Sequence, residues 1–115
     1  YKRQIPIEVY SDTIDLPLEV MMKIGLIVNE LLTNSIKHTL VEKNDELRLV
    51  VALNKDQNDC TLRYHQQSKQ PIDMETLEKT NTLGMKLIRL TVKEMDGTMK
   101  ISNESGLKFV IHFSC

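Results

Sequence analysis

The chain has 115 residues, of which 15 are basic, 16 are acidic and 41% are hydrophobic. This length suits a single domain over residues 1–115, and the nearly balanced charge argues against a nucleic-acid or anionic-lipid partner. Cys60 and Cys115 show no metal-binding spacing and make no disulfide framework, so a reducing compartment is expected. No apolar run reaches the roughly 18–20 residues that span a bilayer. We therefore expect a cytoplasmic domain, while a membrane anchor elsewhere in a parent protein stays open.

The first third of the chain predicts a strand followed by a long helix. Residues 4–10 alternate between apolar and polar side chains, which is typical of a half-buried strand. Asp15 is a candidate N-cap, and the wide apolar stripe after it predicts a helix from Leu16 to about Leu40.

The middle of the chain predicts a hairpin and then an irregular segment. Leu47–Leu53 and Cys60–His65 have strand patterns, and the polar run Asn54–Asp59 between them is the expected turn. Residues 66–82 are polar and irregular, with a short helical turn expected near Met74–Lys79.

The last third predicts a second helix and a closing hairpin. The helix is expected over Leu83–Asp96, with Gly97 as its left-handed C-cap. Alternation at Met99–Ile101 and again at Leu107–Phe113 predicts two strands, joined by a turn at Asn103–Gly106. Two amphipathic helices and about five strands can bury their apolar faces only in layers. An α+β fold with helices covering one side of a sheet follows.

Polar side chains recur along one face of the first predicted helix. Glu30, Asn34 and Lys37 or His38 are spaced so that a carboxylate, an amide and a cation share that face. Carboxylate and amide oxygens suit Mg²⁺, and an ammonium group suits phosphate oxygens. Spacing alone, however, favours the simpler interpretation that this is the solvent-facing side of an amphipathic helix.

Two longer strings add to this pattern. The run Asn-Glu-Leu-Leu-Thr-Asn-Ser-Ile-Lys-His over residues 29–38 closely resembles the N box of the GHKL ATPase superfamily. Its Lys-His ending looks like one branch of bacterial sensor histidine kinases. Thr-Leu-Gly-Met-Lys-Leu-Ile over residues 82–88 resembles the G2 box, which ends the lid over the nucleotide. The resemblance covers nearly the whole chain from about residue 5.

The resemblance implies a Bergerat-type fold, in which a mixed, mostly antiparallel five-stranded sheet carries helices on one face. It implies that Asn34 is a Mg²⁺ ligand and that Glu30 is a catalytic residue near the metal and the attacking group. The nucleotide or phosphate contacts that it implies are Lys37, His38, Thr82, Gly84 and His65.

The activity implied by the resemblance is the ATP- and Mg²⁺-dependent phosphorylation of a histidine. That histidine lies on a dimerisation domain of the same protein, and a response regulator is the later partner of the full-length kinase. The resemblance implies no contact of this domain with nucleic acid or membrane.

The third superfamily motif, the G1 box Asp-x-Gly-x-Gly, is altered in this chain. In the family its Asp accepts a hydrogen bond from the adenine amino group. The aligned segment here is His-Gln-Gln-Ser-Lys, with His65 at the Asp position and Gln67 and Lys69 at the two Gly positions. Losing a charged acceptor costs about 1.5–3 kcal/mol. We therefore expect weakened or lost nucleotide binding. Two alternatives remain: a non-catalytic domain used for regulation or docking, and a serine kinase of the anti-sigma-factor type.

Overall fold

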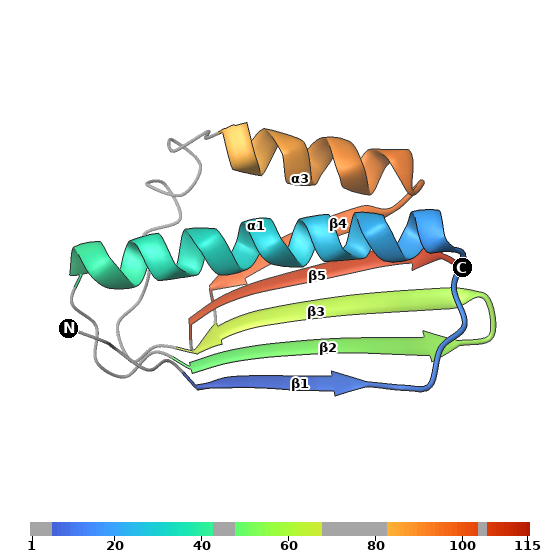
Figure 1. The fold of residues 1–115 in the computed structure, drawn as a ribbon, viewed down its shortest axis with the longest axis horizontal. Coiled ribbons are helices and arrows are strands. Elements are labelled where there is room, and N and C mark those ends of the chain that lie inside the picture. The colour runs from blue at the N-terminus through green and yellow to red at the C-terminus, as the bar shows by residue number, and fades with distance from the viewer. Residues whose placement is uncertain (1–5, 43–47, 68–82, 104–105) are drawn as a thin grey trace.

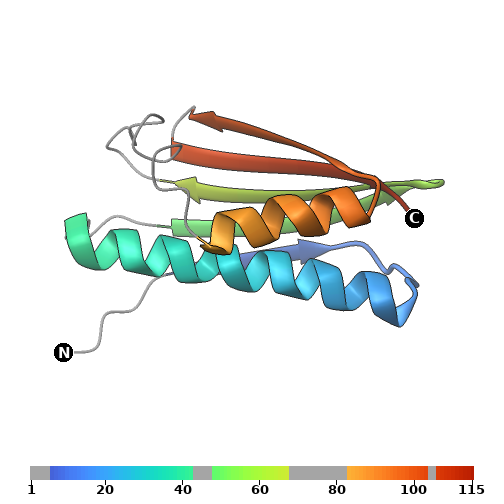
Figure 2. The ribbon, with the colours of Figure 1, turned by 90° about the horizontal axis from the view of Figure 1, so that it is seen from above.

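A computed structural model describes residues 6–42, 48–67, 83–103 and 106–115, without the side chains of residues 37–42. Five strands form one sheet, and two helices cover one of its faces (Figures 1 and 2). The elements are β1 Ile7–Ser11, α1 Leu18–Glu42, β2 Arg48–Asp56, β3 Asp59–Gln67, α3 Leu83–Glu94, β4 Thr98–Asn103 and β5 Gly106–Ser114. The predicted α+β fold, with helices on one face of a five-stranded sheet, is confirmed.

The sheet has the strand order β1-β2-β3-β5-β4. Only β1 and β2 run parallel, and the other three pairs are antiparallel. A parallel pair needs a crossover connection between its strands, and the 25-residue helix α1 supplies it. The sheet is therefore mixed and mostly antiparallel, as the resemblance implies.

The core lies between the sheet and the two helices. Alternate residues of β3 and β5 point into it, because successive side chains of a strand face opposite sides of the sheet. The helices contribute Ile27 and Leu31 from α1 and Met85, Ile88 and Val92 from α3. Among the described helices, none is long and apolar enough to cross a bilayer.

The hairpin β2–β3 is longer than its sequence pattern predicts. Asn54–Asp59 was expected to be a loop, but β2 continues to Asp56 and only Gln57 and Asn58 form the turn. Gln57 has a φ of 56°, in the left-handed region that such two-residue turns require. The residues at this end of the hairpin are exposed. Their polar side chains are therefore compatible with a strand, and no hydrophobic alternation marks it.

The end of α3 also differs in detail from the prediction. The left-handed residue is Asp96, with a φ of 53°, and Gly97 is the residue after it. The amide of Gly97 donates to the carbonyl of Val92 at 2.9 Å, which is the long bond of a Schellman cap. A Cβ on Gly97 would stand 2.7 Å from the carbonyl oxygen of His112. Glycine is thus needed here for close approach between chain segments rather than for its φ.

Cys60 and Cys115 form a disulfide, whereas no disulfide framework was expected from them. They are 55 residues apart in sequence, but the pairing of β3 with β5 brings them together. The amide of Cys115 also donates to the carbonyl of Asn58 at 2.9 Å. The bond therefore ties the residue after β5 to the start of β3.

Replacing Cys115 by Ser is expected to destabilise the fold. Closing a loop of this length removes denatured-state entropy worth up to about 4 kcal/mol in the chain-entropy account. The free energy of unfolding in urea, with and without reductant, measures the effect. The native chain should lose stability in reductant, whereas Cys115→Ser should be equally stable in both conditions. Equal stability of the native chain in both conditions would contradict a structural role for the bond.

Candidate functional site

The site residues predicted from the sequence belong to α1, to the start of α3 and to the end of β3, and α1 contacts both of the other elements. The C-terminal half of α1, the first turn of α3 and the last residues of β3 lie toward the same end of the molecule (Figure 1). The two helices contact each other and run side by side over the sheet (Figure 2). Side chains from these three elements can therefore face one shared region.

Glu30 and Asn34 lie one helical turn apart on α1. Both are half-buried, unlike Asn29 and Thr33, which are exposed on the outer side of the same helix. The structure therefore distinguishes this pair from the solvent-facing residues of α1. Oxygen donors at the border of a buried region are suited to a hard cation such as Mg²⁺.

Two of the predicted contacts fall on α1 beyond Asn34, and one precedes α3. Lys37 and His38 belong to the helix, but their side chains lie outside the described residues, as does Thr82. Gly84 is half-buried in the first turn of α3, where backbone N–H groups are free of partners within the helix. A helix N-terminus of this kind favours an anionic group such as phosphate.

His65 lies on the other side of the sheet from α1. It stands between Tyr64 and Gln66 in β3, and both of these neighbours are buried on the helix-covered side. Because side chains alternate along a strand, His65 points to the opposite face. Its side chain is thus separated from Asn34 by the thickness of the sheet.

The residue that does reach α1 from this part of β3 is Gln66. The hydroxyl of Ser35 donates to Gln66 Oε1 at 2.8 Å and lies 2.6 Å from the hydroxyl of Tyr64. The Tyr64 hydroxyl also lies 3.3 Å from the carbonyl oxygen of Leu31. All three polar side chains are at least 95% buried. This network joins the helix of the predicted N box directly to the strand of the altered G1 segment.

The sequence interpretation missed Ser35, Tyr64 and Gln66 as members of the site. A signal for them exists in the alternation of Cys60, Leu62, Tyr64 and Gln66, which continues the inward face of β3 beyond the expected strand end at His65. Ending the strand two residues early concealed that Gln66 faces the helix.

A shallow hollow of about 660 Å³ lies elsewhere, around the other end of β3. Asn54, Arg63 and His112 are among the residues that line it, and the Thr61 hydroxyl lies 3.0 Å from Nδ1 of His112. Neither Asn34 nor Gly84 lines this hollow, so it is separate from the predicted site.

Comparisons with known proteins bear on the fold. No protein-family model and no curated protein matches the sequence. The structure is similar to the histidine kinase domain of the blue-light-activated kinase EL346 from Erythrobacter litoralis, with a TM-score of 0.77 and 20% identity over 95% of this chain. The chain has the fold of a histidine kinase catalytic domain. It spans 51% of that Erythrobacter chain.

Two further solved structures support the same fold. The nucleotide-free catalytic domain of the histidine kinase ThkA gives a TM-score of 0.72 at 20% identity, covering 96% of this chain and 78% of the ThkA chain. The histidine kinase AdeS of Acinetobacter baumannii gives 0.71 at 16% identity, covering 96% of this chain and 54% of the AdeS chain.

The buried network predicts a stability step at high pH that belongs to Tyr64. Burial raises the pKa of Tyr64 from 10.0 to about 12, although the hydrogen bond with Ser35 acts in the lowering direction. A raised folded-state pKa means that the contribution to stability is complete below pH 10 and is lost as pH rises toward 12. The free energy of unfolding falls by at most about 1.4 kcal/mol per pH unit in this range.

Urea unfolding between pH 9 and pH 11.5 tests this expectation. Tyr64→Phe should flatten the fall in unfolding free energy, while Tyr10→Phe, at an exposed tyrosine, should leave the fall as it is in the native chain. An identical pH profile for the native chain and Tyr64→Phe would contradict the assignment.

Proposed function

We propose that this chain is the ATP-binding, catalytic domain of a two-component sensor histidine kinase, with weakened nucleotide binding. The observation that carries the proposal is the half-buried pair Glu30 and Asn34 on α1, the helix that contacts α3, in a histidine kinase catalytic fold. The N-box string around this pair supports the same assignment.

The residues of the chain have distinct roles in this proposal. Asn34 holds Mg²⁺ through its amide oxygen, and Glu30 acts beside the metal and the attacking group. The other contacts to nucleotide or phosphate come from Lys37, His38, Thr82 and Gly84. Mg²⁺ held there would supply neutralisation of charge on the phosphates, and the main work of the protein in phosphoryl transfer is positioning.

The partners in the proposal follow from the same assignment. The phosphate acceptor is a histidine on a dimerisation domain of the parent protein, and a response regulator receives the phosphoryl group afterwards. The domain acts in the cytoplasm, and it contacts neither nucleic acid nor membrane.

Weak nucleotide binding follows from the end of β3. Gln66 is the residue there that faces α1, and it carries no charge. Its Oε1 already accepts a hydrogen bond from Ser35. An adenine amino group therefore meets no carboxylate among Tyr64–Gln67 at this end of β3, and a charged acceptor is worth about 1.5–3 kcal/mol.

The alternative proposal is a domain that keeps the fold for docking or regulation without turnover. The same network favours it, because Ser35 hydrogen-bonds to both Tyr64 and Gln66 without a ligand. Buried hydrogen bonds of this kind stabilise the domain in the absence of nucleotide. Nothing in the described residues favours the anti-sigma-factor-type serine kinase.

Asn34→Ala and Asn29→Ala form a matched pair for testing the site. A ligand present at its Kd stabilises the fold by about 0.4 kcal/mol, and at 100 times its Kd by about 2.7 kcal/mol. With 1 mM Mg-ATP we expect about 0.4 kcal/mol or less for the native chain, measured as a shift in thermal unfolding. Asn34→Ala should abolish the shift, and Asn29→Ala should retain it because Asn29 is exposed on the outer side of α1.

The outcomes separate the proposals. An equal shift in Asn34→Ala would remove Asn34 from the site. A shift of the native chain worth more than about 2 kcal/mol would contradict weakened binding. No shift even at 10 mM Mg-ATP would favour the docking domain.

Gln66→Asp and His65→Asp form a second matched pair, because adjacent strand residues face opposite sides of the sheet. Gln66→Asp places a carboxylate toward α1 and should tighten Mg-ATP binding by about one to two decades in Kd. His65→Asp places the same group on the far face and should leave Kd unchanged. Calorimetric titration measures both values. Tighter binding in His65→Asp alone would show that our assignment of the two faces to the nucleotide is wrong.

A further inference from the structure

The strand β1 forms one edge of the sheet, and among the described residues only β2 pairs with it. Figure 1 shows it in dark blue along the lower margin of the sheet. An edge strand presents unpaired N–H and C=O groups along its outer side, where another strand can add.

The register of β1 identifies which backbone groups are unpaired. The amide of Leu49 donates to the carbonyl of Pro6 at 3.0 Å, and the amide of Asp12 donates to the carbonyl of Leu53 at 3.2 Å. Even-numbered residues therefore direct their backbone groups toward β2. Because direction alternates along a strand, Ile7, Val9 and Ser11 direct theirs outward.

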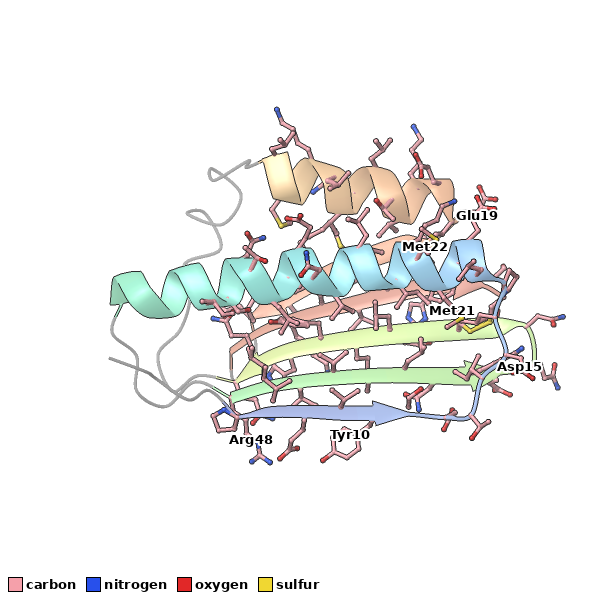
Figure 3. The ribbon with its side chains drawn as sticks, in the orientation of Figure 1. Tyr10, Asp15, Glu19, Met21, Met22 and Arg48 are labelled. Atoms are coloured by element: carbon pink, nitrogen blue, oxygen red, sulfur yellow. A yellow bond between two sulfur atoms is a disulfide. The ribbon has the colours of Figure 1, made fainter. Side chains whose placement is uncertain are left out.

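Two apolar side chains of this edge, Ile7 and Val9, are exposed. Ile7 and Val9 pair in register with Leu49 and Val51, so they lie on the helix-covered side of the sheet, yet they are 49% and 69% exposed. The exposed Met21 of α1 lies over the same side, and Figure 3 shows it on the side of the helix nearer the strands. Ile7 and Val9 thus form a small exposed apolar surface along the edge, with Met21 as a further exposed apolar side chain on the same side of the sheet.

The opposite edge of the sheet is β4, and it is better protected than β1 against the addition of another strand. Met99 and Ile101 of β4 are half-buried and pack against the core. Lys100 stands between them, and a lysine on an edge strand discourages the addition of another strand. The five residues of β1 include no lysine, arginine or proline. Of the two edges, β1 is therefore the one that can accept a further strand.

We propose that β1 pairs antiparallel with β1 of a second copy of this chain, around a two-fold axis at Val9. Backbone groups that point outward must face one another, and an axis through any residue of β1 meets this condition. An axis through Val9, the central residue, pairs all five residues of the strand. Val9 then faces Val9 of the partner subunit, and Ile7 faces Ser11 of the partner subunit. These pairs form about six hydrogen bonds, two for each facing pair.

The charges on β1 fit this register. Glu8 is the one charged residue of the strand, and it faces Tyr10 of the partner subunit rather than a second glutamate. Within one chain the Tyr10 hydroxyl already donates to Glu8 Oε2 at 2.7 Å, and Glu8 also pairs with Arg48. Tyr10 and Arg48 both lie at this edge (Figure 3). The axis thus joins neutral side chains and avoids facing carboxylates.

The small size of this surface limits the affinity expected between the two copies. Stable interfaces bury roughly 800 Å² per partner, and five residues of strand with one neighbouring side chain bury less. We therefore expect a weak dimer that dissociates on dilution. It requires no nucleotide, so it can fail or succeed independently of the proposed kinase activity.

Sedimentation velocity from about 1 µM to 1 mM tests the dimer with two lysine variants on the same strand. Val9→Lys sets two ammonium groups opposite each other across the axis and should abolish dimerisation. Tyr10→Lys sets each lysine opposite Glu8 of the partner subunit and should preserve or strengthen it. A native chain that stays monomeric throughout, or a dimer that Val9→Lys leaves intact, overturns the proposal.

A cross-linking experiment decides the matter if Val9→Lys impairs folding. Facing hydrogen-bonded residues of an antiparallel pair have Cα atoms about 5.5 Å apart, within disulfide range. Val9→Cys should therefore form a covalent dimer under mild oxidation at 100 µM. Tyr10→Cys should not, because its two copies stand about 8 Å apart or more. Cross-linking of Tyr10→Cys but not Val9→Cys, or of neither variant, overturns the register.

Discussion

The packing of α1 across β3 is the constraint on which the proposed site depends. Ile27 and Leu31 are buried on successive turns of α1, and the next turn places Ser35 in hydrogen-bonding contact with Tyr64 and Gln66. That contact fixes both the rotation of the helix about its axis and its height above the sheet. Asn34 precedes Ser35, so its position at the border of the buried face follows from the same contact.

The alternation of β3 then decides which part of the altered G1 segment can meet a ligand. Moving a strand by one residue transfers every side chain to the other face. Tyr64 and Gln66 face α1, while His65 between them does not. A comparison that matches motifs by position alone therefore places His65 in the site. The chemistry available to a nucleotide, by contrast, is that of an uncharged amide held by Ser35.

Hydrophobic periodicity predicted the order, type and approximate extent of the described helices and strands. It failed where the signal is absent or depends on distant residues. The polar ends of β2 and β3 are exposed and carry no alternation, so the turn at Gln57 was placed too broadly. The pairing of Cys60 with Cys115 depends on β5 lying beside β3, which no local pattern reveals. Gly97 was expected to adopt the left-handed conformation at the end of α3, but its neighbour Asp96 adopts it instead.

The connection that positions the site also leaves one edge of the sheet bare. Since β1 and β2 are parallel, the chain must return across the sheet between them, and α1 makes that crossing. The helix lies over the inner strands, where the contact of Ser35 with Tyr64 and Gln66 holds it. It therefore cannot also cover β1, and Ile7 and Val9 remain exposed on a side that is buried in the neighbouring strands. In the proposed register a second copy adds its own strand along this edge. The pairing satisfies the outward backbone groups of β1 without moving the helix on which the Mg²⁺ ligand is proposed to lie.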